Sequence, residues 1–174
     1  TSAKGGISKA AASTGVIGCA GGFPDFAEVN GGKAYNQQIN LNLNQIKALG
    51  VGATRDNNII LRFDGTVELK AGANKIQKDV DDDIWVWVDV NGNGEIDGGE
   101  DKAQTWNGGG YKDLLTVNAP SAGPYRVSIG WKEGGGGQHL RVRIDGKNPT
   151  FNGFMTGKNS NNFNSTKGTT ANLK

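Results

Sequence analysis

Residues 84–100 read IWVWVDVNGNGEIDGGE, and this stretch decides the class of fold that the sequence predicts. Its first five residues are β-branched or aromatic and therefore favour a β-strand. The next residues, from Asp89 to Glu100, match the calcium-loop pattern D-x-[DN]-x-[DN]-G-x5-E at every specified position. Such loops usually join two helices, whereas this one follows a strand. The sequence therefore predicts a calcium loop within a β fold.

The oxygen-bearing residues of this loop recur at alternate positions, which lets a short loop curl around one hard cation. Gly94 permits the sharp turn, and Ile96 can tuck inward. An ordinary hairpin loop is the alternative, and Asp101 is an alternative to Glu100 for closing the ligand shell. Without flanking helices we expect a structural or binding calcium rather than a sensor. The expected ligands are Asp89, Asn91, Asn93, the Glu95 carbonyl, Asp97 and Glu100.

A second acidic cluster, DVDDD at residues 79–83, directly precedes the strand. Its four carboxylates repel one another unless water solvates them or a cation neutralises them. The cluster can be interpreted either as a solvated acidic loop or as a second cation site. The strand at 84–88 separates the two clusters by roughly 17 Å, so one ion cannot serve both. Two sites would therefore lie at opposite ends of the fold.

The strand signals continue on both sides of these clusters. Asp64-Gly65 predicts a tight turn between strands at 59–63 and 66–69. The EGGGGQ run at 133–138 predicts a hairpin loop, because a phosphate-binding loop would instead open a helix. Many short strands with Gly, Asn and Asp turns predict an antiparallel β-sandwich or barrel. Further strands are expected at 39–46, 102–106, 113–117, 125–131 and 139–144, the last two with apolar residues on one face.

Composition limits the size of the core and the kinds of partner. The chain has 174 residues, of which 29 are glycine, and only 35% of it is hydrophobic. The net charge of +2 does not indicate the basic surface that nucleic-acid binding requires. No apolar run is long enough to span a membrane. We expect a small-residue segment at 1–32, the sandwich at 33–150 and a polar tail at 151–174. The terminal segments pack either on their own sandwich or along the sheet edge of a neighbouring copy.

Four stretches, which cover about half of the chain, resemble the PA14 domain of bacterial toxins, glycosidases and yeast adhesins. They are FDGTVELKAGANKIQKDVDDD (63–83), DDDIWVWVD (81–89), TWNGGGYKDLLTVNAPSAGPYRVSIGW (105–131) and WKEGGGGQHLRVRI (131–144). The resemblance implies a jelly-roll β-sandwich. In the adhesin branch of this family, an aspartate pair is similar to a calcium site that binds a sugar by its hydroxyls. The resemblance implies that Asp81 and Asp82 correspond to this pair. The chain departs from the family at Asp83, where a small residue is usual, and at the 89–100 loop, which replaces a tight turn.

No catalytic constellation stands out in the sequence. Cys19 is the only cysteine and His139 the only histidine, and no feature of the sequence links them as a nucleophile and its base. Cys19 is expected to be a buried small side chain, with an interchain disulfide as the alternative. Trp85 and Trp87 share one face of a strand, which favours packing over stacking on a sugar. Asn164 begins an Asn-Ser-Thr glycosylation sequon.

We therefore predict a secreted, calcium-stabilised, non-catalytic β-sandwich at the cell surface. Its expected role is that of a self-assembling structural or adhesive subunit, a homo-oligomer or polymer formed through its terminal segments. The alternative is a calcium-dependent carbohydrate-binding module whose partner is a glycan.

Overall fold

A computed structural model describes the backbone of residues 16–20, 23, 25–29, 34–35, 59–133 and 139–159, and the side chains of residues 23, 61–132 and 139–153. Every element within these ranges is a β-strand. The strand expected at 39–46 and the sequon at Asn164 lie outside them. The strands are β1 (Val16–Ala20), β2 (Asp25–Val29), β3 (Ala34–Tyr35), β4 (Ile59–Leu69), β5 (Gly72–Asp81), β6 (Asp83–Asp89), β7 (Asp101–Gln104), β8 (Lys112–Ala119), β9 (Gly123–Glu133), β10 (His139–Ile144) and β11 (Phe151–Asn159).

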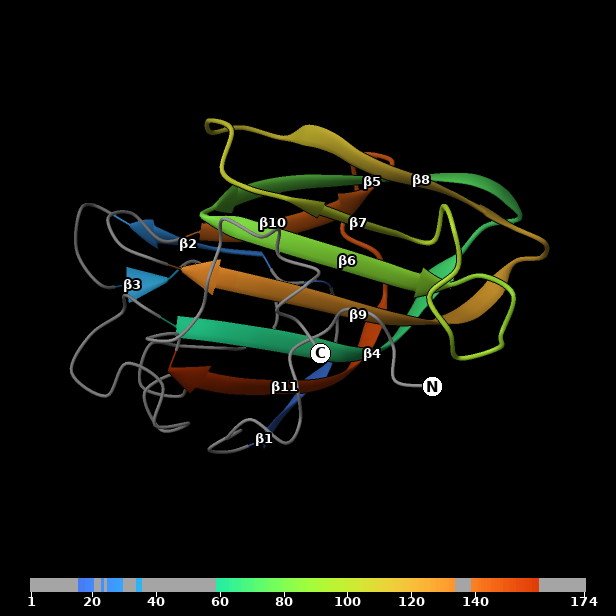
Figure 1. Cartoon of the computed structure of the whole chain (residues 1–174), viewed down its shortest axis with the longest axis horizontal. Coiled ribbons are helices and arrows are strands. Elements are labelled where there is room, and N and C mark those ends of the chain that lie inside the picture. Colours follow the sequence, from blue (N-terminus) through green and yellow to red (C-terminus); the bar gives the residue numbers. More distant parts are fainter. Residues whose placement is uncertain are drawn as a thin grey trace.

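The strands form two antiparallel sheets that face each other (Figure 1). One sheet has six strands in the order β1-β11-β4-β9-β6-β7, and the other has five in the order β3-β2-β10-β5-β8. From β4 onward the chain passes repeatedly from one sheet to the other, and β6–β7 is the one sequential pair in this part that stays within a sheet. The expected all-β antiparallel fold is thus confirmed, in a form consistent with a β-sandwich.

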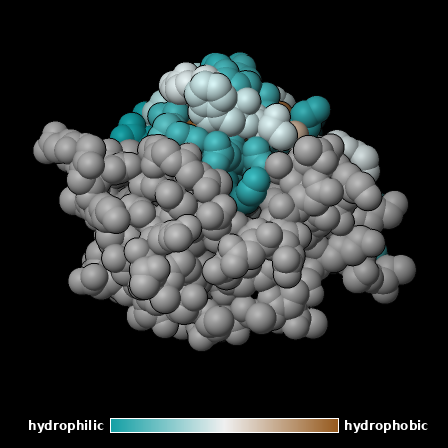
Figure 2. All heavy atoms as spheres, turned by 60° about the vertical axis from the view of Figure 1, so that its left-hand side comes forward, coloured by the Kyte–Doolittle hydropathy of each residue, from teal (hydrophilic) through white to brown (hydrophobic). Residues whose placement is uncertain are grey.

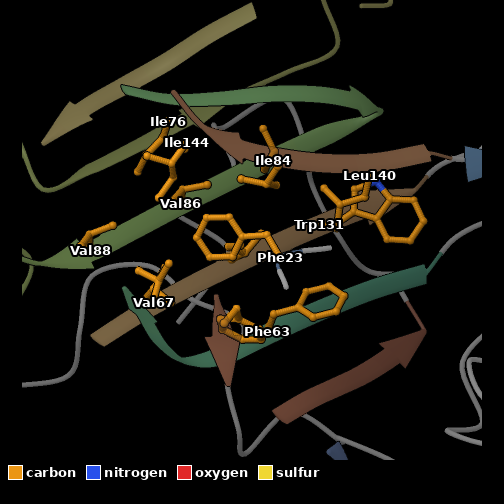
Figure 3. Packing of buried hydrophobic residues seen from close by; sticks show 14 of the residues in the cluster. Phe23, Phe63, Val67, Ile76, Ile84, Val86, Val88, Trp131, Leu140 and Ile144 are labelled. Carbon is orange, nitrogen blue, oxygen red and sulfur yellow. The ribbon is translucent and has the colours of Figure 1, made fainter. Parts of the chain in front are cut away.

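One hydrophobic core fills the space between the sheets (Figure 3). The alternating pattern of β10 places Leu140, Val142 and Ile144 in it, as predicted. Trp131 on β9 is also fully buried there. Phe23, from the N-terminal segment, has no exposed surface and lies with its ring centroid 5.7 Å from that of Phe151. The core therefore joins segments that lie far apart in the sequence. The burial of each such side chain contributes about 1.5–3 kcal/mol to stability.

The predicted turn at Asp64-Gly65 is wrong, because both residues lie inside the continuous strand β4. Gly65 pairs with Gly153 of β11. A Cβ atom added to Gly65 would lie 2.0 Å from the main-chain oxygen of Asn152 and 2.6 Å from Cα of Gly153. Glycine is therefore required here for close approach of two backbones rather than for a turn.

The predicted hairpin at EGGGGQ is also wrong. The strands on either side, β9 and β10, belong to different sheets, so they are not partners. β9 pairs with β4 and β6, whereas β10 pairs with β2 and β5. The connection crosses between sheets, which the alternation within each strand could not reveal, because alternation identifies a buried face but not the neighbouring strand.

The terminal segments contribute strands to the sandwich itself. β1 pairs with β11, and β11 pairs with β4 along its whole length. β2 pairs with β10. Within the ranges that the structure describes, no helix is long and apolar enough to cross a membrane.

Candidate functional site

Strand β6 lies at the centre of the candidate site because an acidic cluster adjoins each of its ends. All seven residues of β6 are buried, on both faces of the sheet. Ile84, Val86 and Val88 face the core between the sheets. Trp85 and Trp87 point to the opposite face, where Ile96 and Ala103 pack against them. The expected packing role of the two tryptophans is confirmed, but they form a second apolar cluster outside the main core.

The 89–100 loop is the connection of the β6–β7 hairpin, visible at the arrow end of β6 in Figure 1. The hairpin is closed by the Val88 amide, which donates to the Glu100 carbonyl at 2.9 Å. Ile96 turns inward onto the two tryptophans, as expected from the sequence. The indole N–H of Trp85 donates to Asp101 at 2.9 Å. Asp101 is therefore directed toward Trp85, which leaves Glu100 as the better candidate for closing a ligand shell.

Side-chain acceptors at alternate positions organise the first half of the loop. Asp89 Oδ2 accepts from the Gly94 amide at 2.9 Å, and Gly94 has a positive φ of 75°. Asn91 Oδ1 accepts from the Asn93 amide at 3.1 Å. Asn93 Oδ1 accepts from the Glu95 amide at 2.8 Å. These bonds curl the backbone of the loop.

Asp97 and Glu100 close the loop from its second half. Asp97 Oδ2 accepts from the side-chain amides of Asn91 at 2.6 Å and Asn93 at 2.8 Å. These two hydrogen bonds lower the pKa of Asp97. Glu100 Oε1 accepts from the amides of Val90 at 2.8 Å and Asn91 at 3.2 Å, and its Oε2 accepts from that of Asp97 at 3.2 Å. Five of the expected ligands, Asp89, Asn91, Asn93, Asp97 and Glu100, thus belong to one hydrogen-bonded unit, which the Glu95 amide also joins.

One atom of this unit has no partner. Asp89 is 4% exposed, and its Oδ1 atom is buried without a hydrogen bond among the residues described. A buried, ionised oxygen without a donor is unfavourable by several kcal/mol in general, so such atoms call for an explanation. A cation beside Asp89 would provide one. The described residues contain no cluster of three His, Cys, Asp or Glu side chains placed to hold a metal, whereas calcium also accepts amide and main-chain oxygens.

The second acidic cluster lies at the other end of β6, as expected. Asp81 and Asp82 adjoin each other through a cis peptide bond, and their side chains share a hydrogen bond. Burial, this hydrogen bond and the charge of Asp82 raise the pKa of Asp81 to about 7. Asp81 therefore keeps a proton for part of the time near neutral pH, and a cation can take the place of that proton.

The other two carboxylates of this cluster already lie beside basic side chains, since Arg141 Nη1 is 4.0 Å from Asp79 Oδ2. Asp79 Oδ1 lies 3.0 Å from Nε2 of His139 and accepts from the Gly110 amide at 3.0 Å. The Asp79 and His139 atoms are close enough for an ion pair, but the geometry is not that of a hydrogen bond. Asp83 lies 3.8 Å from Nζ of Lys132, and burial raises the pKa of Asp83. Asp81 and Asp82 are thus the better candidates for holding an ion.

Trp106 lies close to this cluster, because its backbone amide bonds to Asp83. It is 54% exposed and is the one large hydrophobic side chain exposed within the described ranges. Figure 2 views the molecule from the side on which β6 begins, and the described residues on that face are mostly hydrophilic. Trp106 is therefore accessible for stacking on a sugar ring, whereas Trp85 and Trp87 are buried. Cys19 and His139 lie in strands of different sheets.

Comparisons with family models, with curated proteins and with solved structures give no match. The resemblance to the PA14 domain therefore rests on the sequence motifs alone.

Proposed function

We propose that this protein is a calcium-stabilised, non-catalytic β-sandwich that serves outside the cell as a structural or adhesive subunit of a surface or fibre. The observation that carries the proposal is the 89–100 loop, with its buried and unpartnered Asp89 Oδ1. The ligands would be the oxygens of Asp89, Asn91, Asn93, Glu95, Asp97 and Glu100. Bound calcium would supply the positive charge that this loop lacks.

A calcium ion at this position would fix the hairpin against the sandwich. The loop carries Ile96, which packs on Trp85 and Trp87, so ordering of the loop also protects the outer face of β6. The chain contains a single cysteine and no intrachain disulfide can form. Extracellular calcium, at about millimolar concentration, fills even a weak site and stabilises the folded state by mass action.

Assembly is supported by the edges of the sheets. β8 spans eight residues and is the last strand of its sheet, where the described residues offer it only β5 as a partner. An edge strand of this length presents backbone donors and acceptors to which a strand of another copy can pair. The described parts of the terminal segments pair within their own chain, so an interchain contact would involve either an exposed edge such as β8 or an exchange of β1 or β11 between copies.

The test measures calcium binding and particle size on the same sample. Trp85 and Trp87 lie beneath the loop, so intrinsic fluorescence and the melting temperature should both respond to calcium added after chelation. Light scattering and negative-stain microscopy then compare particles with calcium and with chelator. Regular long particles support the fibre role, and their loss with chelator places calcium at or near the contacts. A monodisperse monomer in both conditions excludes polymer formation but not calcium binding.

A calcium-dependent carbohydrate-binding module is the second candidate, supported by the carboxyl pair Asp81–Asp82 close to exposed Trp106. The pair would hold calcium, the ion would bind sugar hydroxyls, and the indole would stack on the ring. A glycan screen in calcium, repeated with Asp82→Ala and Trp106→Ala, tests this role. Binding that survives both substitutions would exclude this end of β6 as the sugar site.

A further inference from the structure

A cavity lies beside the calcium loop, at the opposite end of β6 from Asp81 and Asp82. Its volume is about 360 Å³, and it is lined by residues 89–92 on one side and residues 124–126 on the other. Small-molecule sites have volumes of about 300–1,000 Å³, so this one has room for a single sugar residue. Asp89 and Asn91 of the proposed calcium site form part of its wall.

Arg126 contributes an unused positive charge to the cavity. It lies directly opposite Asp89 in the pairing of β9 with β6. No ion pair or hydrogen bond joins it to any residue that the structure describes, and Asp89 instead accepts from Gly94. The guanidinium lies against the loop, since a Cβ on Gly94 would be 3.1 Å from its Nη1. The five N–H donors of Arg126 are therefore available to a ligand, and their planar arrangement matches a carboxylate.

The other wall residues favour a ring-shaped ligand. Pro124 is exposed and Tyr125 is half-buried at the edge of the cavity, and Tyr125 also packs against the main core. The hydroxyl of Tyr125 donates to the Ser121 carbonyl at 2.8 Å, and this hydrogen bond fixes the position of the ring. Asn91 and Gly92 supply polar groups on the facing wall. An aromatic or proline ring opposite polar groups suits a sugar, which has apolar ring faces and hydroxyl edges.

We propose that this cavity binds an acidic sugar, such as a uronic acid, through Arg126, and that calcium in the 89–100 loop strengthens the binding. The inference rests on the proposed calcium site, because Asp89 and Asn91 belong to both. Without calcium, the carboxylate of Asp89 makes this wall negative and opposes an anionic ligand. Calcium neutralises two of the three carboxylate charges of its ligands, so the wall becomes less negative and opposes the carboxylate that Arg126 binds much less. By thermodynamic reciprocity, the acidic sugar then tightens calcium binding by the same factor.

The test compares two ligands that differ only in the carboxylate, methyl β-D-glucuronide and methyl β-D-glucoside. Isothermal titration or ligand-observed NMR on the full chain, in calcium and then in chelator, measures both affinities. We expect the glucuronide to bind about tenfold or more tightly than the glucoside in calcium, as one charge-assisted contact supplies. This preference should disappear in chelator.

Variants separate this inference from the calcium site. Arg126→Gln should abolish the preference for the glucuronide while the fluorescence titration with calcium alone is unchanged, and Arg126→Lys should retain part of the preference. The matched control is Arg143→Gln, because Arg143 lies on the other sheet with its guanidinium 4.1 Å from the ring centroid of Tyr111.

Three outcomes would overturn the inference. Calcium binding without any preference for the glucuronide refutes the acidic-sugar site and leaves the calcium loop intact. Failure of the chain to bind calcium refutes both. An acetylated aspartyl peptide that binds more tightly than the glucuronide, with the same dependence on Arg126, would assign the cavity to acidic peptides instead.

Discussion

Asp89→Asn should affect stability in opposite directions with and without calcium. The buried Oδ1 atom of Asp89 has no hydrogen-bond partner among the described residues, whereas Oδ2 accepts from Gly94. Asparagine keeps an oxygen for the Gly94 amide and removes the buried negative charge. In chelator the variant should therefore be at least as stable as the parent protein, because a buried charge without a donor is more unfavourable than the neutral amide group that replaces it.

Calcium should reverse the order. At a calcium concentration of about 100 times the dissociation constant, binding stabilises the parent protein by about 2.7 kcal/mol. The variant lacks the charge of the first ligand of the loop, so it should gain little at the same concentration. Urea unfolding followed by tryptophan fluorescence, in chelator and in millimolar calcium, measures both differences in the free energy of unfolding.

The sign change is what identifies a cation site. If Asp89→Asn lowers stability equally in chelator and in calcium, then the carboxylate serves only to hold the hairpin and the loop is not a calcium site. Asp113→Asn is the matched control, since Asp113 is an exposed carboxylate on β8 that pairs with Lys75. Its effect should be small and the same in both conditions.

Three further predictions concern the rest of the sandwich. Gly65→Ala should destabilise the fold by about 3 kcal/mol or more in urea unfolding, because its Cβ would collide with the backbone of β11 around Gly153. Lys78 has no exposed surface, and its burial and the charge of Lys112 lower its pKa. Lys78→Met should therefore stabilise the protein at pH 7 by about 1 kcal/mol or more in the same assay. This gain should shrink toward pH 10, where the lysine loses its charge. In chelator, stability should fall as the pH rises from about 4 to about 7, because the folded state holds the proton of Asp81 that the unfolded chain releases, and Asp81→Asn should flatten this slope.

Local pattern was sufficient to predict which residues face the core. The alternation of β10 and of β9 correctly predicted Leu140 and Trp131 as buried, because side chains in a strand alternate between two faces regardless of which strand lies alongside. The strand at 84–88 was predicted from its β-branched and aromatic residues, and with it the position of an acidic cluster at each of its ends.

Sheet membership could not be predicted, because it depends on contacts between distant segments. Gly65 is needed for a close approach to Gly153, and this partner is far away in the sequence. A glycine in such a position looks the same in sequence as a glycine in a turn. The wall formed by residues 124–126 was missed for the same reason, since only the pairing of β9 with β6 brings Arg126 to the loop.

The two acidic clusters differ in the pKa of their carboxyl groups, and this difference determines the order in which they would bind calcium. In the loop, amide donors lower the pKa of Asp97, so the ligand is ionised well below neutral pH. At the other end of β6, Asp81 has a pKa raised to about 7 and shares its proton with Asp82. A cation there must displace that proton, so its apparent affinity falls about tenfold for each pH unit below 7. A calcium titration at pH 6 should therefore report the loop alone, and a second binding event should emerge above pH 7 and disappear in Asp82→Asn. Two events at pH 6, or a second event insensitive to Asp82→Asn, would show that the carboxyl pair is not the second site.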